Sequence, residues 1–402
     1  MRNIIVNSLN QVPLEQQMIE VVERKGLGHP DTICDCIMNE VSVNLSKEYL
    51  DKTGTILHHN IDKSLLAAGE VETRFGGGIV KKPMKLIFGD RATYKVDGTD
   101  IAVANIAIKT AKDWFRKNMR FVDPDEHLVY QVEIQPGSSA LTDIFRRGGK
   151  VLEANDTSAA VGWAPLTKTE KTVLATEKYL NSPEFKKMFP ETGEDVKVMG
   201  LRKRDKLELI ISIAFIDRLI ESEKHYFVKK NEVLEEITRF VKENNNFEKI
   251  DVQLNTLDMP GRGVNGVYLT VLGTSADGAD SGQVGRGNRV NGLISLNRPQ
   301  CSEAAAGKNP TSHVGKIYNL LTHKIANEIN MQIPETKEVY VWMLSKIGKP
   351  IDDPAVVAVQ VICESNTVFT KVKKAAEEIV EYELENIDKF CMDLAYGKIS
   401  VC

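Results

Sequence analysis

The stretch GLGHPDTICDCIMNEVSVNLSKEYLDKTG, residues 26–54, places a glycine turn directly before a helical pattern. Apolar residues recur every four positions, which is the spacing of one face of an α-helix: Ile33, Ile37, Val41 and Leu45. Pro30 suits the first helical turn, and Gly54 suits the helix end. The sequence therefore predicts a helix over 31–50 whose N-terminus is presented by the turn at 26–31.

Strands and helices alternate along the rest of the chain. Strand patterns cover 64–71, 128–134, 207–216, 267–273, 293–296, 339–344 and 355–363, and helical patterns cover 233–244, 314–330 and 371–390. The run LELIISIAFI, 207–216, is apolar enough for burial on both faces. The polar segment 182–194 contains two prolines and is predicted to be a surface loop. The alternation indicates an α/β or α+β protein.

Composition and charge narrow the class of protein. The chain has 402 residues, 42% of them hydrophobic and 27% charged, which is typical of a globular protein with a large core. The net charge of −4 argues against a nucleic-acid binder and against a polybasic membrane anchor. Because the sequence has no long apolar span and no signal-peptide pattern, we expect a cytoplasmic protein with no membrane partner.

The segment 261–292 holds nine of the chain's 28 glycines. It contains GRGVNG, but a dinucleotide-binding loop should follow a strand and open a helix, and here Pro260 precedes the motif. Hairpin turns would explain the glycines too. Phosphate binding is favoured because cations and carboxylates lie in and after this segment: Arg262, Arg286, Arg289, Arg298, Lys308, Lys316, Asp277 and Asp280.

His29 and Asp31 stand at the predicted helix N-terminus, where free N–H groups and the helix dipole attract anions. His29 can donate a hydrogen bond to a phosphate oxygen, and Asp31 can bind a metal ion that bridges phosphates. A structural imidazole and a simple capping carboxylate remain alternative interpretations of these two residues.

Five blocks together resemble S-adenosylmethionine synthetase, specifically its archaeal type. They are KGLGHPDTICD (25–35), NIDKSLLAAGE (60–70), IQPGSSALTDIF (134–145), NDTSAAVGWAPLT (155–167) and the glycine-rich block 261–319. The resemblance implies that the methionine sulfur attacks C5′ of ATP and displaces triphosphate, which is then hydrolysed to phosphate and diphosphate. It also implies Mg²⁺, at two sites, with K⁺ as a further candidate cofactor, and a homodimer with active sites at its interface.

The fold implied by the resemblance is α+β, with three similar α/β subdomains around a pseudo-threefold axis, each a mixed sheet with helices on one face. We expect one interleaved unit over 1–402, with discontinuous subdomains. Its approximate sequence blocks are 1–125 with the GHPD motif, 126–255 with PGSSALT, and 256–402 with the glycine-rich phosphate loops.

The resemblance also implies roles for individual residues. The expected catalytic residues are His29, Lys206, Arg286 and Lys308. The expected ATP-binding residues are Gly137, Ser138, Ser139, Ala140, Leu141, Thr142, Asp280 and Arg289. Glu70 and Asp156 are expected to bind methionine, and Asp31 is expected to bind metal. The second metal-binding Asp of the bacterial branch is missing after Lys308, so Asp277 or Asp280 is a candidate to replace it.

Two other functions fit part of the pattern. An ATP-dependent kinase or ligase could use the same phosphate loops, although no arrangement of residues suggests a base for a hydroxyl acceptor. A non-catalytic nucleotide- or RNA-binding protein could use GRGNR (285–289), but aromatic residues for base stacking are scarce.

Overall fold

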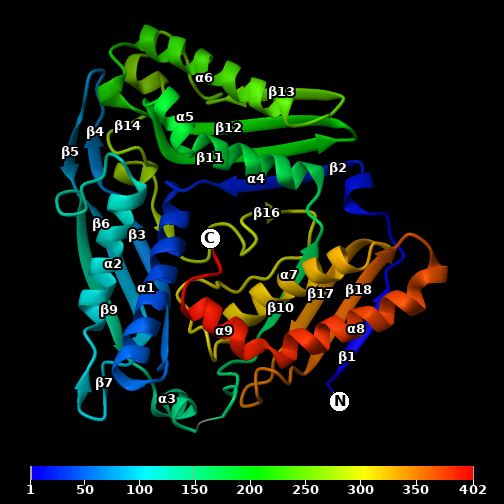
Figure 1. Ribbon diagram of the computed structural model, residues 1–402. Helices are drawn as coiled ribbons and strands as arrows, with labels where there is room; N and C mark the ends of the chain where they lie inside the picture. Colours follow the sequence, from blue (N-terminus) through cyan, green and yellow to red (C-terminus); the bar gives the residue numbers. More distant parts are fainter. Residues whose placement is uncertain (1, 148, 402) are drawn as a thin grey trace.

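The computed structural model describes residues 2–147 and 149–401, and it contains three mixed β-sheets with helices packed on each. Figure 1 shows the sheets and their helices around a central region, in which the C-terminal end of the chain lies. Within the described residues, no helix is long and apolar enough to cross a membrane.

The first sheet carries the helix predicted from residues 26–54. Its strand order is β15 (Gly282–Gln283), β3 (His59–Ala67), β6 (Met84–Ala92) and β9 (Leu128–Pro136), and α1 (Pro30–Thr53) and α2 (Val103–Asn118) pack on it. Helix α1 begins with Pro30 in its first turn and ends at Gly54, whose φ is 73°. The glycine accepts this left-handed conformation, which terminates the helix. The predicted helix is therefore confirmed.

The second sheet has the strand order β13 (Lys249–Leu254), β12 (Lys206–Ile216), β11 (Thr192–Lys203), β2 (Ile19–Lys25) and β16 (Ile294–Ser295), and β14 (Leu269–Thr270) also pairs with β12. Helices α4 (Lys168–Leu180) and α6 (Glu223–Glu243) pack on it. The predicted surface loop at 182–194 is wrong. Helix α5 (Pro183–Met188) and the start of β11 occupy it, because Phe185 and Phe189 are buried in the core. Strand β12 is not buried on both faces throughout, since Ile210 is 36% exposed.

The third sheet has the strand order β1 (Ile4–Ser8), β18 (Val356–Cys363), β17 (Thr336–Leu344) and β10 (Ala159–Ala164). Helices α7 (Val314–Gln332) and α8 (Phe369–Glu385) pack on it, and α9 (Ile387–Ala395) follows α8. The remaining short elements are the hairpins β4–β5 (Glu70–Glu72 and Ile79–Lys82) and β7–β8 (Lys95–Val96 and Thr99–Asp100), and the short helix α3 (Ser139–Asp143).

The three sheets share one topology. In each, the first two strand pairs are antiparallel and the third is parallel: β15-β3-β6-β9, β2-β11-β12-β13 and β10-β17-β18-β1. Three helices follow a strand that belongs to a neighbouring sheet rather than to the sheet that the helix covers. Strand β2 precedes α1 but pairs with β11, β10 precedes α4 but pairs with β17, and β15 precedes α7, with the short strand β16 between them, but pairs with β3. The chain therefore connects the three sheets in a cycle.

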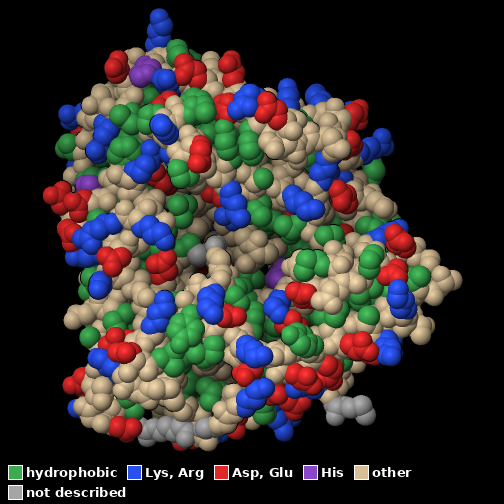
Figure 2. Space-filling model, in the orientation of Figure 1, with side chains coloured by type: hydrophobic (Ala, Val, Ile, Leu, Met, Phe, Trp, Pro, Cys, Tyr) green, Lys and Arg blue, Asp and Glu red, His purple; other side chains and the backbone are tan. Residues whose placement is uncertain are grey.

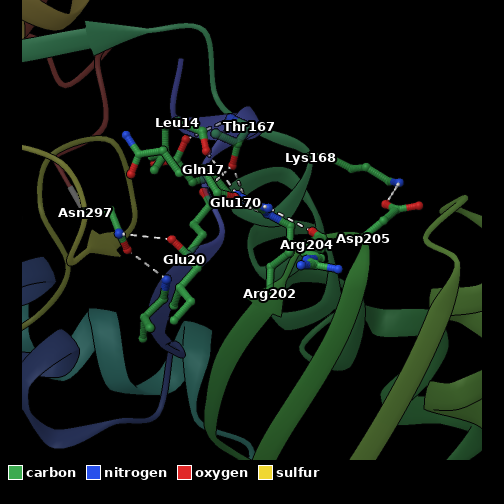
Figure 3. Close-up of polar contacts among 12 residues, drawn as sticks. Leu14, Gln17, Glu20, Thr167, Lys168, Glu170, Arg202, Arg204, Asp205 and Asn297 are labelled. Atoms are coloured by element: carbon green, nitrogen blue, oxygen red, sulfur yellow. Dashed lines mark hydrogen bonds and ion pairs between the residues drawn. The ribbon is translucent and has the colours of Figure 1, made fainter. Parts of the chain in front are cut away.

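A buried polar network adds a second connection between sheets (Figure 3). Arg202 on β11 donates to Glu20 on β2 at 2.9 Å and to the carbonyl oxygen of Leu14 at 3.0 Å. Thr167, the N-cap of α4, donates its hydroxyl to the other oxygen of Glu20 at 2.6 Å. Arg298 then links Glu170 to Tyr340 on β17 of the third sheet. These contacts join the second and third sheets through charges that are removed from water.

Candidate active site

The turn before α1 is fixed by β11. The N–H of Gly28 donates to the carbonyl oxygen of Glu194 at 2.9 Å, and a Cβ on Gly28 would lie 2.4 Å from the Glu194 backbone. Only glycine fits so close an approach. The next residue, His29, is the N-cap of α1, and its Nδ1 accepts the N–H of Asp31 at 3.2 Å.

This hydrogen bond determines what His29 can do. Burial lowers the pKa of His29, so the imidazole is neutral near pH 7. Because Nδ1 accepts a hydrogen bond, the ring proton belongs on Nε2. His29 therefore offers one neutral N–H donor at a helix N-terminus, where the dipole favours an anion.

A cavity of about 500 Å³ lies beside His29. Its walls come from β11, β12 and the loops at 255–258, 265–268 and 275–280, and include Asp195, Lys197, Asn255, Tyr268 and Asp280. Asp195 and Lys197 are two apart on β11, so they share one face of the strand. Asp195 is buried and accepts both the N–H (2.8 Å) and the hydroxyl (2.6 Å) of Ser275. The cavity thus has a cation, carboxylates, amides and one aromatic ring.

Asp31 lies in the first turn of α1 with both carboxylate oxygens engaged. Oδ1 accepts the N–H of Gln283 at 2.9 Å, and Oδ2 accepts Lys25 Nζ at the same distance. Lys25 also donates to the carbonyl oxygen of Arg286 at 2.7 Å. The glycine-rich segment therefore lies against the N-terminus of α1, as phosphate binding at this point would require.

Several other predicted residues gather around this helix end. Arg286 is exposed, and Arg289 is half-buried, with an Nε that has no hydrogen-bond partner among the described residues. Glu70 is exposed at the start of β4, next to the loop that carries Asp280, since Gly69 donates to the carbonyl oxygen of Ala276 at 3.0 Å. Asp277 is buried instead, and its carboxylate accepts the N–H groups of Val271 and Leu272.

Lys308 lies in a second polar cluster, farther along α1. It pairs with Asp62 and, at 2.7 Å, with Glu303. Lys316, also buried, reaches Asn39 of α1 at 3.0 Å. Asn39 is eight residues from Asp31, or about 12 Å along the helix. Asp156 follows Asn155, whose backbone N–H donates to the carbonyl oxygen of Ser312, four residues after Lys308 in the chain.

Two predicted parts of the site are not brought to His29 within one chain. Lys206 is exposed at the β11–β12 hairpin, 4.0 Å from Glu248, and it is six residues, about 20 Å, from Ser212 in the cavity wall. The segment 137–142 lies at the other end of α1: Gly137 and Thr142 line a separate cavity of about 570 Å³ with Thr53. The 24 residues of α1 span about 36 Å.

Comparison with known proteins decides the family. The family model for S-adenosylmethionine synthetase (AdoMet synthetase) matches residues 2–398. The chain belongs to the S-adenosylmethionine synthetase family. This confirms the predicted family and its enzyme class, methionine adenosyltransferase. The S-adenosylmethionine synthase of Caldivirga maquilingensis is 44% identical, with 99% of both chains covered, and that of Thermococcus onnurineus is 46% identical, covering 100% of this chain and 98% of the relative.

A solved structure described as an unusual S-adenosylmethionine synthetase, from Campylobacter jejuni, matches with a TM-score of 0.60. The alignment covers 94% of each chain at 15% identity, so this likeness shows the fold alone. Among the described residues, no group of three or more His, Cys, Asp or Glu side chains could hold a metal ion by itself. Members of the S-adenosylmethionine synthetase family generally use divalent metal ions.

The sequence analysis did not single out several residues of the cavity beside His29. Lys197, Asp195 and Tyr268 line this cavity, and the predicted Lys206 does not. The sequence does contain a signal for two of them, because the alternation Asp-Val-Lys at 195–197 puts a carboxylate and a cation on one face of a strand. Tyr268 lies in the predicted strand at 267–273, and no motif in the sequence marks it as a site residue.

Proposed function

We propose that this chain makes S-adenosylmethionine from ATP and L-methionine, with the adenosine of ATP in the cavity beside His29. The observation that carries the proposal is a neutral, Nε2-protonated His29 at a helix N-terminus, facing a cavity that also holds Lys197 and Tyr268. The ring of Tyr268 offers a surface for a nucleobase, and Lys197 offers a charge for phosphate. We assign to Lys197 the catalytic role that the resemblance implies for Lys206.

The reaction requires little acid–base chemistry from the protein. A bond forms between the methionine sulfur and C5′ of ATP, and the C5′–O5′ bond breaks, with its electron pair leaving on triphosphate. The thioether carries no proton, so no general base is needed. His29 would donate from Nε2 to the departing oxygen, while Lys197, Arg286 and Lys308 would stabilise the polyanion. Triphosphate is then hydrolysed to phosphate and diphosphate.

Mg²⁺ fits the residues at the N-terminus of α1. This ion is usually held by one or two carboxylates together with substrate phosphates and water, and Asp31 and Asp280 are carboxylates of this kind. A bound Mg²⁺ would neutralise charge that develops on the leaving triphosphate. Asp277 is a poor second ligand, because its carboxylate is buried and its Oδ2 accepts two backbone N–H groups. Asp31 would have to release Lys25 from its Oδ2 to bind the ion. K⁺ remains a further candidate cofactor.

We further propose a homodimer in which each site combines residues of both subunits. The segment 137–142 can serve the ATP site only from a second copy, since it lies at the far end of α1. Exposed apolar side chains on the sheets supply a surface for that copy: Ile5, Leu65, Val129, Ile210, Trp342 and Leu344. Glu70 and Asp156 would then bind methionine.

The shared topology supports a pseudo-threefold arrangement of three subdomains. A cyclic exchange of β2, β10 and β15 between neighbouring sheets is what a closed, threefold-related unit would contain. The three subdomains would be discontinuous in sequence, because each takes at least one strand from elsewhere in the chain.

One experiment separates the candidate functions. Purified protein is incubated with ATP, Mg²⁺ and labelled methionine, and the products are resolved. We expect a labelled sulfonium together with equal amounts of phosphate and diphosphate. ADP formed without methionine would instead indicate a kinase, and nucleotide binding without turnover would indicate a binding protein.

Variants test the site. His29→Ala and Asp31→Asn should fold but lose transfer. His127→Ala is the matched control, because Nδ1 of His127 also accepts a backbone N–H, from Asp123 at 2.9 Å, outside the residues that line the cavity. Full turnover by both site variants would show that the turn is only structural.

A further inference from the structure

Asp35 lies one helical turn beyond Asp31 on α1 and points at the glycine-rich segment. Its side chain is 6% exposed, and its Oδ1 accepts the N–H of Gly285 at 2.8 Å. The N–H of Gly287 also donates to this carboxylate. Asp35 forms no ion pair with a Lys or Arg of the described residues, and burial raises its pKa to about 7 against the opposing effects of the two amides and of the Arg289 charge. Two backbone amides are therefore the main partners of a buried carboxylate.

The segment 282–287 is shaped to receive this carboxylate. Gly285 has φ of 82°, a conformation that disfavours side chains other than glycine. A Cβ on Gly287 would lie 2.3 Å from Asp35 Oδ2, and one on Gly282 would lie 2.1 Å from the backbone of Pro30. The glycines thus let the segment lie directly on the first two turns of α1.

Arg286 is the residue between the two anchored amides. Its own carbonyl oxygen is held by Lys25 Nζ at 2.7 Å, while its side chain is exposed. The backbone on both sides of Arg286 is therefore fixed by groups from β2 and α1, which also fixes the direction in which its side chain leaves the main chain. A loop of this glycine content would otherwise have many conformations available.

We infer that Asp35 is a positioning residue: it holds residues 285–287 so that Arg286 meets the triphosphate leaving group. The inference rests on the proposed function. Capping of α1 does not explain Asp35, because His29 is the N-cap and the oxygens of Asp35 are turned to another segment. Stability alone does not explain a carboxylate buried here, since its desolvation costs free energy that an apolar side chain of similar size would avoid.

The test is a double-mutant cycle with Asp35→Asn and Arg286→Ala. In the asparagine variant an N–H₂ group would face one of the two backbone donors, so one anchor is lost. We expect Asp35→Asn to lower kcat/KM for ATP by roughly 10- to 100-fold through misplacement of Arg286. Because Asp35 acts through Arg286, the double variant should be no slower than Arg286→Ala alone. A loss that multiplies across the two variants would overturn the inference.

Two further measurements make the result unambiguous. Calorimetric titration with inorganic triphosphate should show weaker binding by Asp35→Asn, and an unchanged affinity would contradict the inference. Asp51→Asn, an exposed position on the same helix, is the matched control and should leave both values unchanged. If Asp35→Asn fails to fold, Gly287→Ala disturbs the same contact from the loop side. Inactive wild-type protein would contradict the proposed function, whereas a multiplicative loss in an active protein contradicts only this inference.

Discussion

Replacing Arg202 by methionine removes the centre of the polar network in Figure 3. The guanidinium donates to the Glu20 carboxylate at 2.9 Å and to three carbonyl oxygens, those of Leu14, Gln17 and Arg204, at 2.8–3.0 Å. The Glu20 side chain is 0% exposed. Without Arg202, the hydroxyl of Thr167 is the one hydrogen-bond partner that the described residues leave to this carboxylate.

The size of the effect follows from this burial. Removing one partner of a buried ion pair destabilises a protein by about 3–5 kcal/mol, because the remaining charge is buried without compensation. A folded domain is stable by only about 5–15 kcal/mol, so Arg202→Met should remove about a fifth or more of that margin. Replacing Glu20 by leucine as well should restore much of the loss, since no buried charge then remains.

Urea denaturation, followed by circular dichroism and by tryptophan fluorescence, measures the change. Trp163 is a local reporter, because Arg298 of the same network lies 5.9 Å from its ring. Arg204→Met is the matched control: Arg204 is exposed, and methionine shares its unbranched stem at the same positive φ of 56°. The control should stay within about 0.5 kcal/mol of wild type. An Arg202→Met variant as stable as the control would refute the reasoning.

Two further predictions concern the site and acid stability. Lys197→Met should raise the KM for ATP or abolish turnover, while Lys206→Met should leave steady-state kinetics unchanged. Equal effects of the two substitutions would contradict the assignment of this role to Lys197 in place of Lys206. Burial lowers the pKa of His59 and of His313 to about 3 each, with Lys316 beside both and Lys308 and Asp62 also beside His313. At these two positions the unfolded chain therefore binds more protons below about pH 6.5, and each histidine should lower the free energy of unfolding by up to about 1.4 kcal/mol per pH unit as the pH falls. Because burial raises the pKa of Asp35 and of Asp277 to about 7, these carboxyls act in the opposite direction. Urea midpoints of wild type and of His313→Gln at pH 7.0 and 5.5 isolate the contribution of the histidine, and an equal pH dependence of the two proteins would contradict it.

The parts of the fold that sequence predicted well are those with local signals. Helix α1 has a regular apolar period, a proline at its start and a glycine at its end, and each acts within a few residues. The strand predicted at 267–273 shows the limit. Only Leu269–Thr270 is a strand, because Asp277 takes the N–H groups of Val271 and Leu272 that a longer ladder would need.

The candidate site also contains residues that local sequence signals predict and residues whose positions depend on the fold. His29 and Asp280 both line the cavity, and both were predicted from motifs that carry chemistry in a few adjacent residues. The position of Lys206 depended instead on the register of a hairpin. Lys203 pairs with Lys206, so the turn is at 204–205 and Lys206 lies at the distal end. A different turn position would have brought a different lysine to the cavity, and the sequence alone does not choose between them.

The position of the cavity follows from the exchange of strands. Strand β2 belongs to the second sheet, yet the turn at its end starts α1 on the first, so His29 lies where the two sheets meet. The other walls come from β11, and from the loop that leads to β15 of the first sheet. Main-chain ladders fix β2 and β11 on this side of the cavity, and loops form the rest of its wall. Loss of turnover and loss of structure should therefore coincide when Arg202→Met is denatured with urea, although Arg202 is five residues, about 17 Å, from Lys197 along β11.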